Sequence, residues 1–185
     1  MINMEIEIRA KINSLTSIEN KLNLLKARFI KKVKQVDKYY GEISLYKKLN
    51  HSFLIRIRKE GNKNILNYKG AKRKKDGIWE EHETEINNPK EAELILKNIG
   101  FEKVIEVYKN RLEYKLNNLN ICLDKIKGLG NFIEIEEINK NAISKKNIIK
   151  LMKDLGISKN EIINQGYVTL LLRKNKNKFS KYIIN

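Results

Sequence analysis

Hydrophobic and polar residues alternate strictly near the start of the chain, in the stretch EIEIRAKI at positions 5–12. Apolar residues occupy the even positions and charged residues the odd ones. A period of two places successive side chains on opposite faces of a β-strand. Taken alone, the pattern fits an edge strand with a solvated outer face. It also fits a strand whose two acids and two bases line a polar cavity.

Similar alternation predicts strands along most of the chain. The stretch at 53–70 reads as a hairpin, with two alternating segments joined through Gly61. The other predicted strands cover residues 31–40, 78–86, 103–116, 119–126 and 128–138.

Three segments carry helical patterns. Residues 16–29 begin with a capping-box pair, Thr16 and Glu19, and their apolar face is formed by Leu22, Leu25 and Phe29. Residues 87–100 carry Asn88 as N-cap, with proline at the first helical position and glycine just past the end. The final third, 144–172, is predicted to be helical.

This order of elements, with short connections between many strands, predicts an α+β fold. We expect an antiparallel sheet, closed on itself, with helices packed outside. The length of 185 residues suits one domain with a substantial core. We assign residues 1–173 to that domain and 174–185 to a basic C-terminal tail.

Composition narrows the functional classes. One cysteine and two histidines give no basis for an intrachain disulfide or a zinc centre. No apolar run is long enough for a membrane span and no signal peptide opens the chain, so we expect a soluble cytoplasmic protein, monomeric or homodimeric. The net charge of +17 predicts a preference for anionic ligands. Lys, Asn and Ile all have A/T-rich codons, so we attribute much of the excess lysine to genome base composition rather than to a nucleic-acid-binding surface. We therefore do not expect nucleic acid as the partner.

Charged residues recur at period two on nearly every predicted strand. If these faces point into a closed sheet, helices cover the apolar exterior and the interior holds acids and cations together. The cations suit a polyanion such as a triphosphate, because Arg offers forked contacts and Lys a point charge. The carboxylates suit Mg²⁺ or Mn²⁺, which prefer oxygen ligands. The candidate cations are Arg9, Lys11, Arg56, Arg58, Lys69, Lys109 and Arg111.

Several of these stretches together resemble one known family. EIEIRAK resembles the E-x-E-x-K signature of the CYTH family, the triphosphate tunnel metalloenzymes. In chain order, VDKYYG, LIRIR, NYKG, EEHETEI, VYKNRLEY and ICLDKIKGLGNFIEIE are similar to further motifs of that family. The resemblance extends over about residues 3–172. Within the family, the ending EIINQGYVTLLL is similar to that of the class IV adenylyl cyclase subgroup.

The resemblance implies an eight-stranded antiparallel tunnel that binds a triphosphate along its axis and divalent metal at one side. It implies metal binding by Glu5, Glu7, Glu134 and Glu136, with Asp124 close by as a further catalytic residue. It also implies phosphate binding by the seven cations named above. Tyr40 and the acidic pair Glu83 and Glu85 are further substrate-site positions on the same basis.

Three positions depart from the family pattern. Arg9 stands where the family usually has Lys, Gly41 where it commonly has Asp, and Trp79 near the usual Arg. None of them removes a metal carboxylate. The resemblance therefore predicts an enzyme that binds ATP and converts it to cyclic AMP and pyrophosphate. A hydrolase of inorganic, thiamine or nucleoside triphosphate is the alternative, and a non-catalytic triphosphate-binding module is the third reading.

Overall fold

The computed structural model describes residues 4–41, 53–73, 78–138 and 145–175. For residues 4–5, 71–73 and 78–79 it describes the backbone alone. The side chain of Glu5 and residues 176–185 of the predicted tail therefore lie outside the description.

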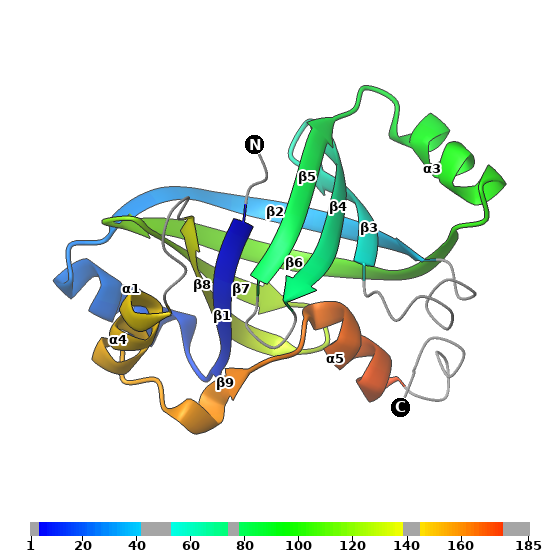
Figure 1. Ribbon diagram of the computed structural model, residues 1–185. Helices are drawn as coiled ribbons and strands as arrows, with labels where there is room; N and C mark the ends of the chain where they lie inside the picture. The colour runs from blue at the N-terminus through cyan, green and yellow to red at the C-terminus, as the bar shows by residue number, and fades with distance from the viewer. Residues whose placement is uncertain (1–3, 42–52, 74–77, 139–144, 176–185) are drawn as a thin grey trace.

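One antiparallel sheet dominates the molecule (Figure 1), and its strands pair in the order β5-β4-β3-β2-β6-β7-β8-β1-β9. The strands are β1 (Met4–Ile12), β2 (Arg28–Gly41), β3 (Phe53–Glu60), β4 (Lys63–Arg73), β5 (Ile78–Glu85), β6 (Glu102–Leu116), β7 (Leu119–Ile126), β8 (Gly130–Ile138) and β9 (Ile162–Ile163).

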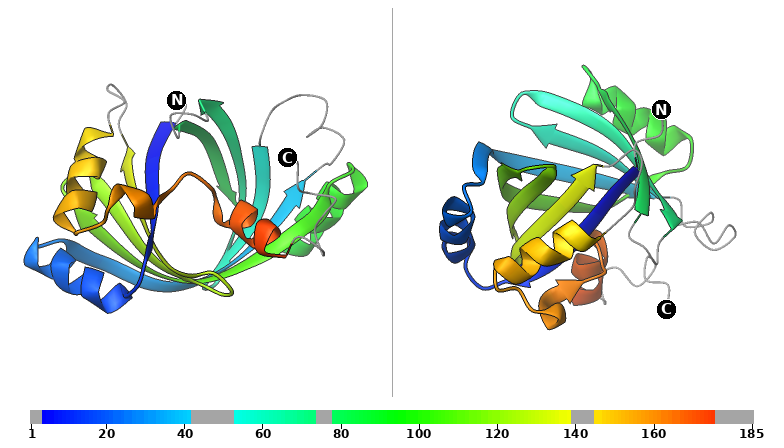
Figure 2. Two further views of the ribbon diagram at one scale, coloured as in Figure 1. Left: turned by 90° about the horizontal axis from the view of Figure 1, so that it is seen from below. Right: turned by 60° about the vertical axis from the view of Figure 1, so that its left-hand side comes forward.

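The sheet curls strongly, as the left panel of Figure 2 shows. The curl brings β1 beside β5, where the two strands pair over three residues, Met4 with Glu80 through Ile6 with Ile78. We call the space inside this curl the lumen, and the side of each strand that faces it the inner face.

Three of the described helices cover the outer face of the sheet. Helices α1 (Leu15–Leu24) and α4 (Lys146–Asp154) pack on β1, β6, β7 and β8, with Ile18, Leu22, Ile148 and Leu151 meeting isoleucines of the strands. Helix α3 (Pro89–Asn98) buries Leu96 against Tyr40 and Ile57. The even-numbered isoleucines of β1 lie in the first of these cores, which explains the alternation at the start of the chain.

The last helix, α5 (Tyr167–Lys174), packs differently from the prediction that helices lie outside the barrel. Its Tyr167, Val168, Leu171 and Leu172 share a cluster with Val107 and Phe132. Those two strand residues have the same parity as Arg111 and Glu134, so they belong to the inner face. The inner face is apolar at this end, and α5 therefore covers it.

Several local predictions are confirmed and others are wrong. Asn88 caps α3 by accepting a hydrogen bond from the Glu91 amide, as predicted. The N-cap of α1 is Ser14, not Thr16, and Phe29 lies on β2 with half of its surface exposed. The final third is not continuous helix, because a 3₁₀ turn (Lys159–Glu161) and β9 separate α4 from α5.

The α+β class and the antiparallel sheet are thus confirmed, with β9 as a strand that the sequence did not predict. Among the described helices, none combines the length and apolar character that a membrane crossing requires.

The packing of α1 can be tested with two leucines that lie two positions apart. Leu22 is fully buried and Leu24 is 83% exposed. Leu22→Ala leaves a cavity under the helix, so we expect it to lower the free energy of unfolding by about 2–5 kcal/mol in urea titrations. Leu24→Ala is the matched control and should change it by about 0.5 kcal/mol or less. Equal effects of the two would mean that α1 is not docked as described.

Candidate functional site

Charged side chains from strands β1 to β8 meet in the lumen, because each of these strands alternates its residues between the two faces. Ion pairs then link neighbouring strands. The network that surrounds the carboxylate cluster and Asp37 contains the cations Arg9, Arg56, Arg58, Lys69, Lys109 and Arg111 and the carboxylates Glu7, Asp37, Glu81, Glu83, Asp124, Glu134 and Glu136.

Three carboxylates gather where β1 and β8 run side by side. In this register Glu7 lies opposite Glu136, and Arg9 lies opposite Glu134. Carboxylate oxygens of Glu7, Glu134 and Glu136 all lie within 4.8 Å of one another. This is the spacing of oxygen ligands around one hard divalent cation, so the donor set fits Mg²⁺ or Mn²⁺.

Arg9 joins two of these carboxylates. Its Nε donates to Glu134 at 2.8 Å and its Nη2 donates to Glu7 at 3.3 Å. Burial opposes the charge of this guanidinium, but Glu134 and Glu7 raise its pKa well above the usual value. Conversely, burial is outweighed by Arg9 and Arg111, which hold the pKa of Glu134 well below its ordinary range. Glu134 is therefore ionised, the form that a metal ligand needs.

Arg111 and Asp124 form a forked ion pair beside the carboxylate cluster. The guanidinium donates to both Asp124 oxygens at 2.7 Å and to Glu134 at 3.3 Å. Tyr167 of α5 completes this part of the site, since its hydroxyl donates to Asp124 at 3.0 Å. The Tyr167 ring also lies under Arg9, with the guanidinium carbon 4.5 Å from the ring centroid.

Asp37 of β2 gathers a second cluster of cations. Arg58 donates to both of its oxygens, at 2.7 and 3.0 Å. The Lys109 ammonium lies 3.4 Å from Asp37 and the Arg56 guanidinium 3.8 Å. Burial of Asp37 is complete and opposes its charge, but Lys109 and Arg56 hold the pKa of this carboxyl far below its ordinary value.

The strands β3, β4 and β5 supply the remaining wall. Arg56 lies 3.4 Å from Glu81 and 3.2 Å from Glu83, and the Asn67 amide donates to both acids. Lys69 bridges from Glu81 at 3.4 Å to Glu7 at 3.2 Å, and so connects this wall to the carboxylate cluster. The Nε of Arg56 is buried and makes no hydrogen bond within the described structure. It is a donor available to an anion in the lumen.

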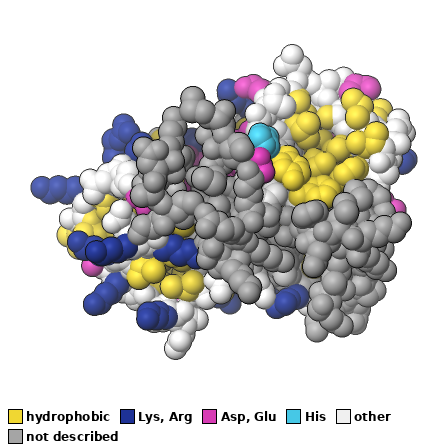
Figure 3. Space-filling model, viewed as in Figure 1, with side chains coloured by type: hydrophobic (Ala, Val, Ile, Leu, Met, Phe, Trp, Pro, Cys, Tyr) yellow, Lys and Arg dark blue, Asp and Glu magenta, His cyan; other side chains and the backbone are white. Residues whose placement is uncertain are grey.

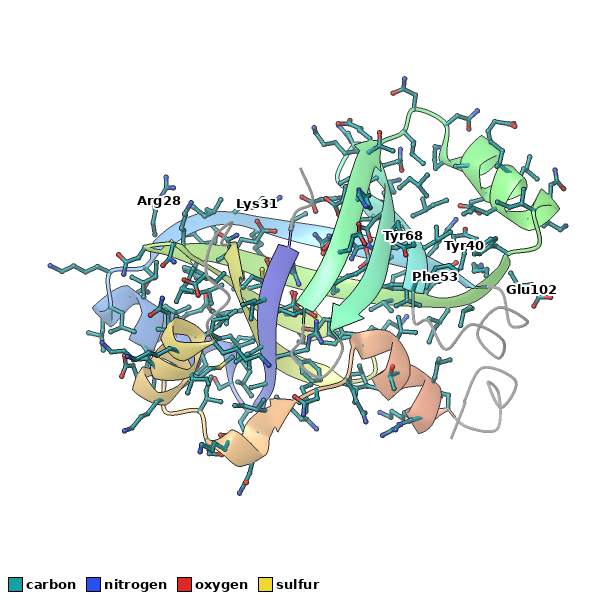
Figure 4. The ribbon with its side chains drawn as sticks, in the orientation of Figure 1. Arg28, Lys31, Tyr40, Phe53, Tyr68 and Glu102 are labelled. Atoms are coloured by element: carbon teal, nitrogen blue, oxygen red, sulfur yellow. The ribbon has the colours of Figure 1, made fainter. Side chains whose placement is uncertain are left out.

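Three predicted positions lie elsewhere. Tyr40 packs with Ile57 and Leu96 on the outer face (Figure 4), because it has the opposite parity to Asp37. Glu85 lies at the rim, paired with Lys63 at 3.0 Å, and both side chains are more than half exposed. Lys11 is exposed near the end of β1. The structure therefore does not bring these three side chains to the charged cluster.

The sequence reasoning also missed inner-face residues. Asp37 lies in the quoted VDKYYG motif but was given no role, although it alternates with Tyr39 and Gln35 on one face. The sequence pattern does place Glu81 on the charged face with Glu83 but gave it no role, and it is the more buried of the two side chains. Tyr167 lies in the C-terminal segment, and the sequence offered no signal that it would reach the lumen.

The ion-pair network described above is close to electrically neutral, with six cations against seven carboxylates. The excess positive charge of the chain therefore lies elsewhere. Figure 3 shows Lys and Arg side chains spread around the α1 and α4 side of the molecular surface. Exposed Lys and Arg side chains there carry part of the net charge outside the lumen.

Comparison with known proteins matches a family model described as the CYTH domain to residues 3–167. A protein of Methanocaldococcus jannaschii that carries the name "Putative adenylate cyclase" is 32% identical over 173 residues, covering 90% of this chain and 98% of that protein. A solved structure from Pyrococcus horikoshii is 30% identical with a TM-score of 0.81, covering 90% of this chain and 98% of the other. A Hippeastrum protein, whose structure is reported to reveal a dominant triphosphatase activity, shares the fold at 19% identity, with a TM-score of 0.64 over 95% of this chain and 96% of its own.

The carboxylate cluster makes a prediction that needs no substrate. Glu136→Gln removes one charged oxygen ligand, so we expect it to weaken Mn²⁺ binding by about tenfold or more, measured by electron paramagnetic resonance of free Mn²⁺. Glu106→Gln is the matched control, because Glu106 pairs with Lys103 on the outer face. If both variants bound Mn²⁺ like the wild type, the cluster would not be the metal site.

Proposed function

The chain belongs to the CYTH domain family, and we propose that it is a divalent-metal-dependent enzyme acting on a triphosphate within the lumen. One observation carries this proposal. Three ionisable carboxylates on β1 and β8 share the lumen with a wall whose arginines lie on β3 and β6, and the buried Arg56 Nε on that wall has no acceptor among the described residues. The first group suits a divalent cation and the second suits phosphate oxygens.

Charge balance supports the requirement for metal. A triphosphate carries about four negative charges, and the described lumen already holds slightly more carboxylates than cations. Burying that anion without further positive charge would be costly. Glu7, Glu134 and Glu136 would hold Mg²⁺ or Mn²⁺, and we propose Glu5 as a further ligand. Such an ion, when bound, supplies positive charge that neutralises and orients phosphate oxygens.

The cations of the chain would bind and orient the substrate. Arg56, Arg58 and Arg111 present forked donors that match phosphate oxygens, while Lys69 and Lys109 supply point charges. Each of these cations lies against a carboxylate in the described structure, so substrate binding exchanges internal partners for phosphate oxygens. Their geometry is already set by these ion pairs, which lowers the cost of ordering them around the substrate.

The leading candidate reaction is cyclisation of ATP. The ribose 3′ oxygen attacks the α-phosphorus, forming a new P–O bond. The bond between that phosphorus and the oxygen bridging to the β-phosphate breaks, and pyrophosphate leaves with the bridging oxygen. The 3′ hydroxyl proton is released. The 32% identical archaeal relative named for adenylate cyclase and the resemblance of the C-terminal segment favour this reaction.

A triphosphatase is the second candidate. In that reaction a water oxygen attacks the terminal phosphorus and the bond to the next phosphate's bridging oxygen breaks. The described inner face favours it in one respect, because its groups are those that bind phosphates and metal and none of the contacts above is dedicated to a nucleobase. The Hippeastrum protein, which shares the fold, is a precedent for triphosphatase activity.

Product analysis distinguishes the candidates. We expect ATP with Mg²⁺ or Mn²⁺ to give cyclic AMP and pyrophosphate, resolved by chromatography, and Glu136→Gln to give almost none. ADP or orthophosphate without cyclic AMP, from ATP or tripolyphosphate, would identify a triphosphatase. If neither triphosphate turned over but one bound in calorimetry, the protein would be a triphosphate-binding module.

Arg56 can be tested by its effect on substrate affinity. Arg56→Ala removes charge-assisted donors, including the free Nε, so we expect KM for the accepted triphosphate to rise about ten- to a hundredfold, or roughly 1.5–3 kcal/mol. Arg28→Ala is the control, since Arg28 is exposed at the far end of β2 (Figure 4). An unchanged KM in the Arg56 variant would remove this side chain from the binding site.

A further inference from the structure

Asp37 differs from the other carboxylates of the lumen. It is fully buried, and three cations from two neighbouring strands lie within 4 Å of its two oxygens. It lies on β2, whereas the metal-type cluster lies on β1 and β8. Because its oxygens already accept two hydrogen bonds from Arg58 and face two further cations, Asp37 has the environment of a bound phosphate rather than of a metal ligand.

We propose that Asp37 is a positioning residue, a built-in counter-anion that assembles Arg56, Arg58 and Lys109 into one phosphate-binding cluster and keeps Lys109 charged. The part that concerns substrate rests on the proposed function. The part that concerns Lys109 is a property of the chain itself and can be measured without substrate.

Lys109 is the member of the cluster that depends most on this carboxylate. Its side chain is 4% exposed, and Asp37 is the carboxylate that lies within 4 Å of its ammonium among the described residues. Burial, together with the nearby Arg111, lowers the pKa of Lys109 to about 8, while Asp37 acts in the opposite direction. The two arginines stay protonated at any working pH, so the lysine alone can lose its charge.

Charged and titratable side chains from several strands and from α5 surround Asp37 and Lys109. Arg56 and Arg58 face Asp37 from β3, and Tyr39 lies beside it on β2. Arg111 of β6 and Asp124 of β7 act on Lys109, and Tyr167 of α5 lies 6.0 Å from its ammonium. Glu134 of β8 also interacts with Lys109 electrostatically. Removing the Asp37 carboxylate would leave three neighbouring cations with less opposing charge. Their mutual repulsion would then be relieved most easily by deprotonation of Lys109.

The decisive variant is Asp37→Asn, which keeps the shape and removes the charge. In protein free of metal and substrate, the Lys109 Cε signal is followed against pH by ¹³C NMR and is assigned by its absence in Lys109→Arg. We expect the wild-type titration near pH 8 and a lower midpoint in Asp37→Asn. Asp154→Asn, at an exposed acid on α4, is the control and should leave the midpoint unchanged.

Activity gives a second readout. Relative to wild type, we expect kcat/KM of Asp37→Asn to be reduced about five- to tenfold more at about pH 8.5 than at about pH 6.5, as for a one-unit fall in the Lys109 pKa. In a Lys109→Arg background, where the charge cannot be lost, the same substitution should show no such pH dependence. A loss of activity that is equal at all pH values, with normal Lys109 titration, would overturn the proposal.

The role of Asp37 can also be measured without the Asp37→Asn variant and without turnover. If Asp37→Asn fails to fold, the Asp37 carboxyl carbon is followed in the wild type, where its shift should change with the Lys109 titration and should not do so in Lys109→Arg. Absence of that change would equally overturn the proposal. If the wild type turns over no triphosphate, the proposed function fails, whereas the NMR titration still decides the role of Asp37.

Discussion

Charge buried on the inner face of the sheet is the constraint on which the rest of the structure depends. An unpaired ion removed from water is strongly destabilising, so a lumen full of charges is possible only if each charge finds an opposite partner. Every cation of the lumen network described above does lie against a carboxylate, and the partners usually belong to different strands. The pairs Arg111–Asp124 and Arg58–Asp37 join adjacent strands, whereas Lys69–Glu7 reaches from β4 to β1 across β5. The strand order brings these ion pairs together, and the ion pairs in turn hold the strands in that order.

Much of this arrangement could be predicted from period two alone. The alternation identified eight of the strands and assigned Arg9, Arg56, Glu134 and others to the charged face. Tyr40 was placed on this face by resemblance to a family motif, although the alternation puts it on the outer face. Tyr39, two residues after Asp37, is the tyrosine with inner-face parity. The position of α5 could not be predicted, because an amphipathic helix reveals that it has an apolar face but not which surface that face will cover.

The registers were equally beyond reach. Whether Arg9 meets Glu134 or Glu136 depends on how β1 slides against β8, and alternation is the same for either choice. The conflict between a net charge of +17 and a nearly neutral lumen has the same origin. A count of lysines does not distinguish those on solvated helices from those that face a carboxylate. Under the proposed function, affinity for a triphosphate would depend on which internal ion pairs exchange for phosphate oxygens, and not on the total charge.

The same internal pairing shapes how one scaffold can support more than one reaction. Metal-type carboxylates and phosphate-type cations are common requirements of cyclisation and hydrolysis, since both reactions stabilise charge on phosphate oxygens. The difference lies in which oxygen attacks and which phosphorus it reaches. Small changes in the lining can alter that choice while the ion-pair network that holds the lumen together is kept.

The pairing of β1 has a consequence for how the protein is made. Two hydrogen-bond partners of Arg9, Glu134 and Gln165, follow it along the chain by 125 and 156 residues. Strand β1 therefore leaves the ribosome with its charged face unmatched and must wait for β8, β9 and α5. Contacts this distant in sequence form slowly. Until they form, the nascent chain carries an unpaired strand of alternating isoleucines and charges, and the lumen is assembled only after residue 165 has been made.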